Sequence, residues 1–119
     1  MRRAREDQRR ALRSLLELDQ PLDAVLRRLA TFGWDSDEEL VTLRPAHVIH
    51  VLKTFQDGEY VAGDVERWAN AVEGRDDIGL DDEAAPLLKE AIFDLANPSL
   101  QGAITPEAAS TWIARLATQ

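Results

Sequence analysis

The two histidines are the side chains best suited to metal or proton chemistry. His47 and His50 are three residues apart, so on a helix both imidazoles would share one face and could bind a metal ion together. The glutamate that follows the first histidine of a zinc-protease helix is missing here. The apolar residues of this segment also fall on the other side of the helix. Three interpretations stay open: two solvated histidines, a metal-binding pair, or a contact with a partner protein.

Carboxylates gather in two polar segments, residues 35–39 and residues 76–83. Such groups could bind calcium, act as a catalytic pair, contact a basic protein, or simply be solvated. Neither segment has the ligand spacing of a calcium-binding helical loop, and paired catalytic carboxylates need a defined cleft. We therefore expect either a contact surface for a basic protein or solvated loops, and we predict no metal site.

One aromatic residue adds to this candidate surface. On a helix Phe93 points roughly opposite to Leu88, Ile92 and Leu95, so either the helix is covered on both sides or Phe93 is exposed at an interface. The candidate partner-binding residues are then Asp35, Asp37, Glu38, Glu39, Asp76, Asp77, Asp81, Asp82 and Phe93.

The chain lacks the usual sequence signatures of catalysis. It has no cysteine, so it offers neither a thiolate nucleophile nor thiolate metal ligands. It contains no nucleophile elbow, phosphate-binding loop or dinucleotide fingerprint. We therefore predict no catalytic residue, no cofactor and no enzymatic activity.

Charge is distributed unevenly. Residues 1–30 carry eight arginines against five acids, whereas residues 31–119 carry six basic residues against seventeen acids, for a net charge of −8 overall. The body of the protein, residues 31–119, should attract basic partners and repel nucleic acid and anionic membranes. The arginine-rich start lacks the interleaved aromatic residues of a nucleic-acid site. We expect Arg9, Arg10 and Arg13 to pair with acids of the body.

Apolar residues recur at helical spacing in six segments. The first ends at Asp19, after a start in which residues 1–10 are either frayed or helical and solvated. The second begins at Pro21 and ends at Gly33. The third begins at Pro45, and the fourth follows the Asp57–Gly58 turn and stops at Gly74. The fifth runs from about Glu83 to Ala96, and the sixth begins at Pro106, with Thr105 as its N-cap.

The intervening segments, residues 34–43 and 75–82, read as loops anchored by a few apolar side chains. An alternating pattern typical of a strand extends over five or more residues only weakly, around Glu39 to Leu43. We therefore predict a single all-α domain over residues 1–119, a compact bundle of five or six helices with no sheet. Trp68 is its largest predicted core residue, and the short linker at Gln20–Pro21 predicts an antiparallel hairpin.

The segment Asp57–Ala69, together with Leu95–Pro98 and Thr105–Glu107, resembles small, largely uncharacterised bacterial helical proteins. Its turn, acidic helix start and aromatic residue also resemble the colicin-D-type immunity proteins, small acidic helical bundles that block a basic toxin nuclease. The resemblance implies a cytoplasmic, non-enzymatic protein that masks a basic toxin or nuclease. The alternative is a structural helical protein acting as a homodimer or as a subunit of a complex.

Overall fold

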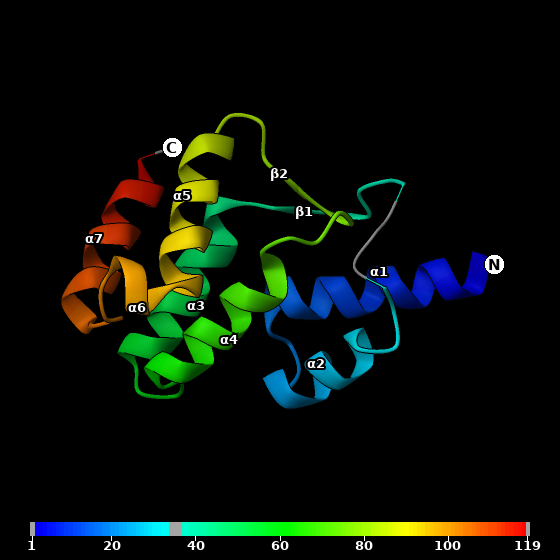
Figure 1. The fold of residues 1–119 in the computed structure, drawn as a ribbon, viewed down its shortest axis with the longest axis horizontal. Coiled ribbons are helices and arrows are strands. Elements are labelled where there is room, and N and C mark those ends of the chain that lie inside the picture. The colour runs from blue at the N-terminus through cyan, green and yellow to red at the C-terminus, as the bar shows by residue number, and fades with distance from the viewer. Residues whose placement is uncertain (1, 34–36, 119) are drawn as a thin grey trace.

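The structure, a computed structural model, describes the backbone of residues 2–33 and 37–118 and, of these, the side chains from residue 5 onward. Over these residues it shows seven helices and two short strands (Figure 1). The chain is mostly helical, as the sequence predicts, but the expected count of five or six helices is too low. The elements are α1 (Arg2–Glu17), α2 (Leu22–Leu29), β1 (Val41–Leu43), α3 (Pro45–Gln56), α4 (Ala62–Val72), β2 (Ile78–Leu80), α5 (Ala85–Ala96), α6 (Pro98–Gln101) and α7 (Pro106–Ala117).

The first two helices form the predicted hairpin. The start of the chain is helical from Arg2 onward, and Leu18 takes a left-handed conformation with φ of 53° just beyond α1. The chain then reverses direction into α2, and Figure 1 shows the two helices running in opposite directions. Their facing sides are buried and apolar: Leu12, Leu15 and Leu16 on α1, and Leu22, Val25 and Leu29 on α2.

Trp68 lies at the centre of the core. It is fully buried on α4, and its indole Nε1–H donates a hydrogen bond of 2.7 Å to the carbonyl of Leu15 on α1. The turn at Gly58, whose φ is +86°, brings α4 back along α3. A hydrogen bond from the Val61 N–H to the Asp64 carboxylate caps the start of α4. Gly74, at φ of +82°, follows the end of the helix as predicted.

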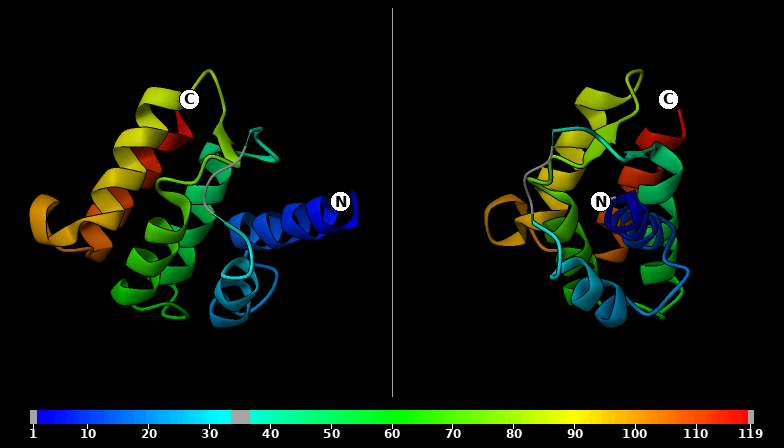
Figure 2. Two further views of the ribbon diagram at one scale, coloured as in Figure 1. Left: turned by 45° about the vertical axis from the view of Figure 1, so that its right-hand side comes forward. Right: turned by 90° about the vertical axis from the view of Figure 1, so that its right-hand side faces the viewer.

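The last three helices complete the other end of the molecule. Helix α5 packs on α4, and α7 packs on α3. Figure 2 shows α5, α6 and α7 at the end opposite the start of α1. Thr105 caps α7 by accepting a hydrogen bond of 3.1 Å from the Ala108 N–H. The Trp112 indole donates to Asp94 on α5 at 2.8 Å. The sequence analysis missed α6, which is a single turn.

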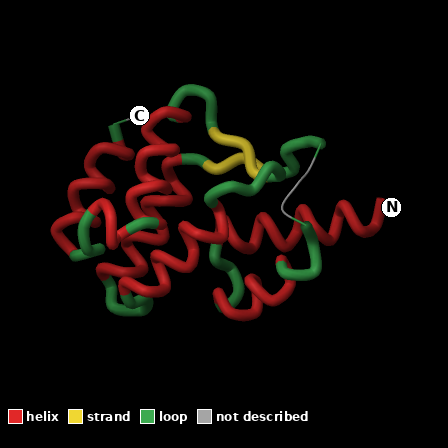
Figure 3. The backbone as a smooth tube through the Cα atoms, viewed as in Figure 1, coloured by secondary structure: helices red, strands yellow, loops and turns green. Residues whose placement is uncertain are grey.

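A small sheet contradicts the prediction that the chain has none. Strands β1 and β2 pair in parallel, with Val41 opposite Ile78, Thr42 opposite Gly79 and Leu43 opposite Leu80 (Figure 3). The two segments predicted as loops, residues 34–43 and 75–82, each contain one of these strands. The weak alternation at Glu39 to Leu43 contains β1, but each strand has only three residues, and two whole helices separate the strands in the sequence.

Candidate functional site

One predicted surface residue is part of the core instead. Asp77 is completely buried, and its carboxylate accepts two hydrogen bonds from the Arg75 guanidinium, at 2.9 and 3.0 Å. Gln8 on α1 donates to the same carboxylate at 2.7 Å, and Arg75 also donates to the Gly33 carbonyl at 3.1 Å. This buried cluster, Arg75–Asp77 with Gln8, joins α1 and the end of the α2 hairpin to the start of β2. The prediction that Asp77 contacts a partner is therefore wrong, because its carboxylate is buried and already accepts hydrogen bonds from Arg75 and Gln8.

The remaining predicted acids differ in their surroundings. Asp35 lies outside the described residues, so its prediction stays open. Glu38 is half exposed and pairs with Arg5 of α1, whereas Asp37 and Asp76 are exposed. Asp81 is partly buried, and its carboxylate accepts a hydrogen bond of 3.3 Å from the Glu83 N–H.

Within the described residues, the three arginines predicted to pair with acids of the body, Arg9, Arg10 and Arg13, do not do so. Arg5, which was not among them, pairs with Glu38. Arg9 instead pairs with Glu6 of its own helix and donates to the Leu40 carbonyl at 3.3 Å. Arg10 and Arg13 are exposed, and among the described residues neither has a recorded ion pair. The predicted pairing of Arg9 with an acid of the body is therefore not what the structure contains.

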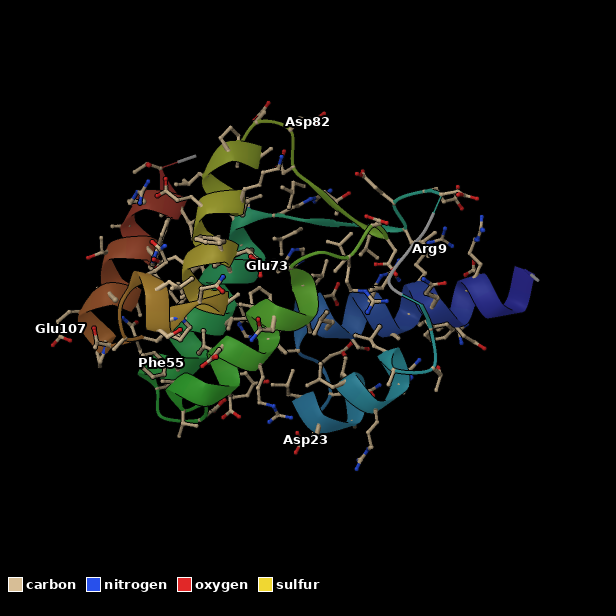
Figure 4. The ribbon with its side chains drawn as sticks, in the orientation of Figure 1. Arg9, Asp23, Phe55, Glu73, Asp82 and Glu107 are labelled. Carbon is tan, nitrogen blue, oxygen red and sulfur yellow. The ribbon has the colours of Figure 1, made fainter. Side chains whose placement is uncertain are left out.

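Two of the predicted acids border a cleft of about 520 Å³ between the end of α4, β2 and α5. Glu39 and Asp82 line it together with Glu73, which the sequence analysis missed. We call this the acidic cleft. Its apolar lining comes from three elements: Val72, Ile78, Leu80, Ala85, Leu88 and Ile92. Figure 4 labels Glu73 at the end of α4 and Asp82 in the turn before α5.

The charges of the acidic cleft are mainly negative. Arg75 lines it, but this guanidinium is already engaged by Asp77. Lys89 on α5 is the other cation in the lining. A second hollow of about 510 Å³ shares Glu39, Leu80 and Asp82 with the cleft and adds Asp81, Glu83, Thr42 and one cation, Arg44. Carboxylates therefore continue from one hollow to the next, around the end of β2.

Glu73 could have been found only through the fold. It stands alone in the sequence, one residue before Gly74, and belongs to neither acidic segment. The end of α4 brings it beside residues from before β1 and after β2. No pattern within twenty residues of Glu73 indicates those neighbours.

The two histidines do not share one environment. His47 is partly buried at the start of α3, and its Nδ1 accepts a hydrogen bond of 3.0 Å from the Arg44 N–H. Burial lowers the pKa of His47 below its ordinary value of 6.5, since the charged imidazolium loses hydration. His50 is exposed. His47 is thus a helix cap, and over the described ranges no group of three or more potential metal ligands occurs.

Phe93 is 45% exposed on α5. Double-sided coverage of this helix, one of the two alternatives at the sequence level, is therefore not found. Its backbone carbonyl accepts a hydrogen bond of 2.8 Å from the Asn97 side chain at the end of α5. Phe93 is not among the residues that line the acidic cleft, although its neighbour Ile92 is.

Comparison with known proteins gives no relative. No protein-family model matches the chain, and neither a curated protein nor a solved structure matches it. In the described part of the chain, no helix combines the length and the apolar character that crossing a bilayer requires.

Proposed function

We propose that the protein is a non-enzymatic binding protein that receives a basic segment of a partner protein in the acidic cleft. By covering that segment it masks the partner, as an immunity-type protein masks a basic toxin or nuclease. The observation that carries this proposal is the placement of Glu39, Glu73 and Asp82 around an apolar cleft floor.

The chemistry of the cleft suits lysine and arginine. Both side chains have an aliphatic stem that packs on apolar surface and a cationic head that prefers carboxylates. The apolar lining, to which Val72 and Ile92 contribute, would take the stem, while the carboxylates would take the head. The surplus of acids over residues 31–119 would also speed the approach of a basic partner and make association sensitive to salt.

The resemblance of Asp57–Ala69 to colicin-D-type immunity proteins supports the masking role. This segment forms the turn and most of α4, the helix whose end borders the cleft. The turn and the helix are built as expected, with Gly58 at positive φ and Trp68 buried. A binding role therefore agrees with both the segment and its position.

The test is salt-dependent capture from a lysate of the source cells, with three forms of the protein. The cleft variant carries Glu39→Gln, Glu73→Gln and Asp82→Asn, which remove three charges and change little else. We expect the wild type to retain a basic chain at low salt and to release more of it as salt rises. The cleft variant should retain at least ten-fold less, which corresponds to about 1.4 kcal/mol of binding free energy.

The control variant carries Asp57→Asn, Glu59→Gln and Glu107→Gln. These three acids are exposed and none of them lines the acidic cleft, yet the change in net charge is the same. The control variant should capture the basic chain as well as the wild type. Equal losses in both variants would mean that overall charge, and not the cleft, is responsible, and the proposal would be abandoned.

The exposed ring of Phe93 favours a second candidate, a homodimer that pairs through α5. An apolar side chain 45% exposed on a helix that also buries an apolar face is suited to such a contact. Sedimentation of the wild type and of Phe93→Ser at high concentration tests it. A dimer that becomes a monomer in the variant supports this candidate, and a monomeric wild type eliminates it.

A further inference from the structure

The outer edge of β2 carries open backbone hydrogen-bonding groups. In a parallel ladder only every second residue of a strand bonds to a given neighbour. The Asp77 carbonyl accepts from the Val41 N–H at 3.4 Å, and the Asp81 N–H donates to the Leu43 carbonyl at 3.0 Å. With the register of the sheet, these bonds direct the N–H and C=O of Gly79 toward β1. The N–H and C=O groups of Ile78 and Leu80 therefore point away from it.

Within residues 2–33 and 37–118, these outward groups have no hydrogen-bond partner. Among the hydrogen bonds of the described residues, none outside the sheet involves the backbone of Ile78 or Leu80. No side chain recorded as a donor or an acceptor reaches them either. Open strand edges are surfaces on which an added strand can pair, so β2 can accept a neighbour on this side.

The acidic cleft lies along the same edge. Ile78 and Leu80 both line it, α5 forms its opposite wall through Leu88 and Ile92, and β1, which is described in full, contributes no residue. The space beside the open edge is therefore the space that we propose for a basic segment. A segment that enters it in an extended conformation meets backbone donors and acceptors as well as carboxylates.

We infer that the partner's basic segment binds as an extended third strand, paired with the open edge of β2. This inference rests on the function proposed above and specifies how the segment is held. Backbone pairing gives affinity without regard to sequence, and the side chains on alternate faces give specificity.

The two faces of the sheet predict the sequence of the segment. Glu39 lies against Gly79, so closely that a methyl group at Gly79 would overlap its carboxylate. Negative charge therefore lies on the face to which Gly79 belongs, and Ile78 and Leu80 occupy the other face. A strand beside β2 should place basic side chains on the Gly79 face and apolar ones on the Ile78 face. The preferred segment thus alternates basic and apolar residues.

The experiment uses two capped seven-residue peptides with the sequence Lys-Val-Lys-Val-Lys-Val-Lys, one normal and one methylated at every internal amide nitrogen. Both carry the same charge, but the methylated peptide cannot donate backbone hydrogen bonds. Binding is followed by amide NMR spectra of the full chain. We expect the normal peptide to bind at least ten-fold more tightly, with slowed amide exchange at Ile78 and Leu80 and little change at Gly79. Equal affinity of the two peptides would overturn the inference.

The cleft variant separates this inference from the proposed function. If both peptides bind equally and the cleft variant binds neither, the acidic cleft remains the site and strand pairing is wrong. If the cleft variant binds the normal peptide as well as the wild type does, both proposals fail.

Leu80→Pro supplies a test from the protein side. It removes one outward N–H and leaves the bonds between Gly79 and β1 in place, and proline is tolerated at strand edges. The variant should keep its helical circular dichroism and lose at least ten-fold in affinity for the normal peptide. A wild type that dimerises without peptide, and becomes monomeric as Leu80→Pro, would assign the edge to a second copy and overturn the inference.

Discussion

Replacing the buried Asp77 with alanine should greatly lower the free energy of unfolding. The substitution removes a carboxylate that is 0% exposed and leaves the side chain of Arg75, 2% exposed, without its countercharge. Gln8 loses its acceptor as well, while the bond from Arg75 to Gly33 remains. A buried guanidinium that loses its paired carboxylate is poorly compensated, because the desolvation cost of the charge is undiminished.

Breaking a buried pair from one side costs about 3–5 kcal/mol, and small domains have only about 5–15 kcal/mol in total. With a urea dependence of about 1.5 kcal/mol per molar, the midpoint should fall by roughly 2–3 M. The double variant Arg75→Met with Asp77→Leu removes both charges and keeps most of the buried volume. It should recover about 2 kcal/mol or more of the loss, since no unpaired charge remains.

The assay is urea unfolding of four proteins: wild type, Asp77→Ala, the double variant with Arg75→Met and Asp77→Leu, and Asp76→Ala. Asp76 is the exposed neighbour, so its replacement should change the free energy of unfolding by about 0.5 kcal/mol or less. A loss below about 1 kcal/mol for Asp77→Ala, or a double variant less stable than the single one, would refute the reasoning.

Three further changes test other parts of the structure. Trp68→Phe keeps most of the apolar volume but leaves the buried Leu15 carbonyl without its 2.7 Å donor. Urea unfolding should therefore show a fall of about 1–3 kcal/mol in the free energy of unfolding. A fall below about 0.5 kcal/mol would contradict the importance of that hydrogen bond. Because the pKa of His47 is lowered in the folded state by burial, the unfolded chain binds more protons, and stability should fall as the pH drops below about 6.5. Urea midpoints at about pH 7 and 5.5 should therefore differ less in His47→Gln than in the wild type; equal differences would contradict the effect of burial on this pKa. Gly74→Ala, at φ of +82°, should lower the free energy of unfolding by about 1–2 kcal/mol, measured by thermal unfolding. Gly63→Ala, inside α4 with open space around it, should raise it by about 0.5–1 kcal/mol. Equal effects of the two substitutions would contradict the role given to backbone conformation.

The helices could be predicted because their signals are local. Thr105 and Pro106 mark the start of α7, and Gly74 marks the end of α4, through preferences that act within one turn. The buried stripe around Trp68 repeats at three and four residues, so the core face follows from helix geometry alone. Each of these signals needs only neighbours in the sequence.

The strands and the cleft depend on partners far along the chain, which is why sequence reasoning missed them. Val41 pairs with Ile78 across two intervening helices. Two local signals were available. The weak alternation at Glu39 to Leu43 contains β1. Arg75 and Asp77 are two residues apart, the spacing that places side chains on one side of an extended segment. Reading 75–77 as extended would have paired these two charges and removed Asp77 from the surface. It would not have placed Glu73 beside Glu39.

The parallel pairing of β1 and β2 has a consequence for the order of folding. Pairing of the strands closes the chain between residues 41 and 78 into a loop at an entropic cost, so we expect it to follow the packing of α3 and α4. The acidic cleft borders β2, so it does not exist in earlier folding stages. A ligand of the cleft would therefore bind the finished fold alone, and mass action would draw partly folded chains toward completion.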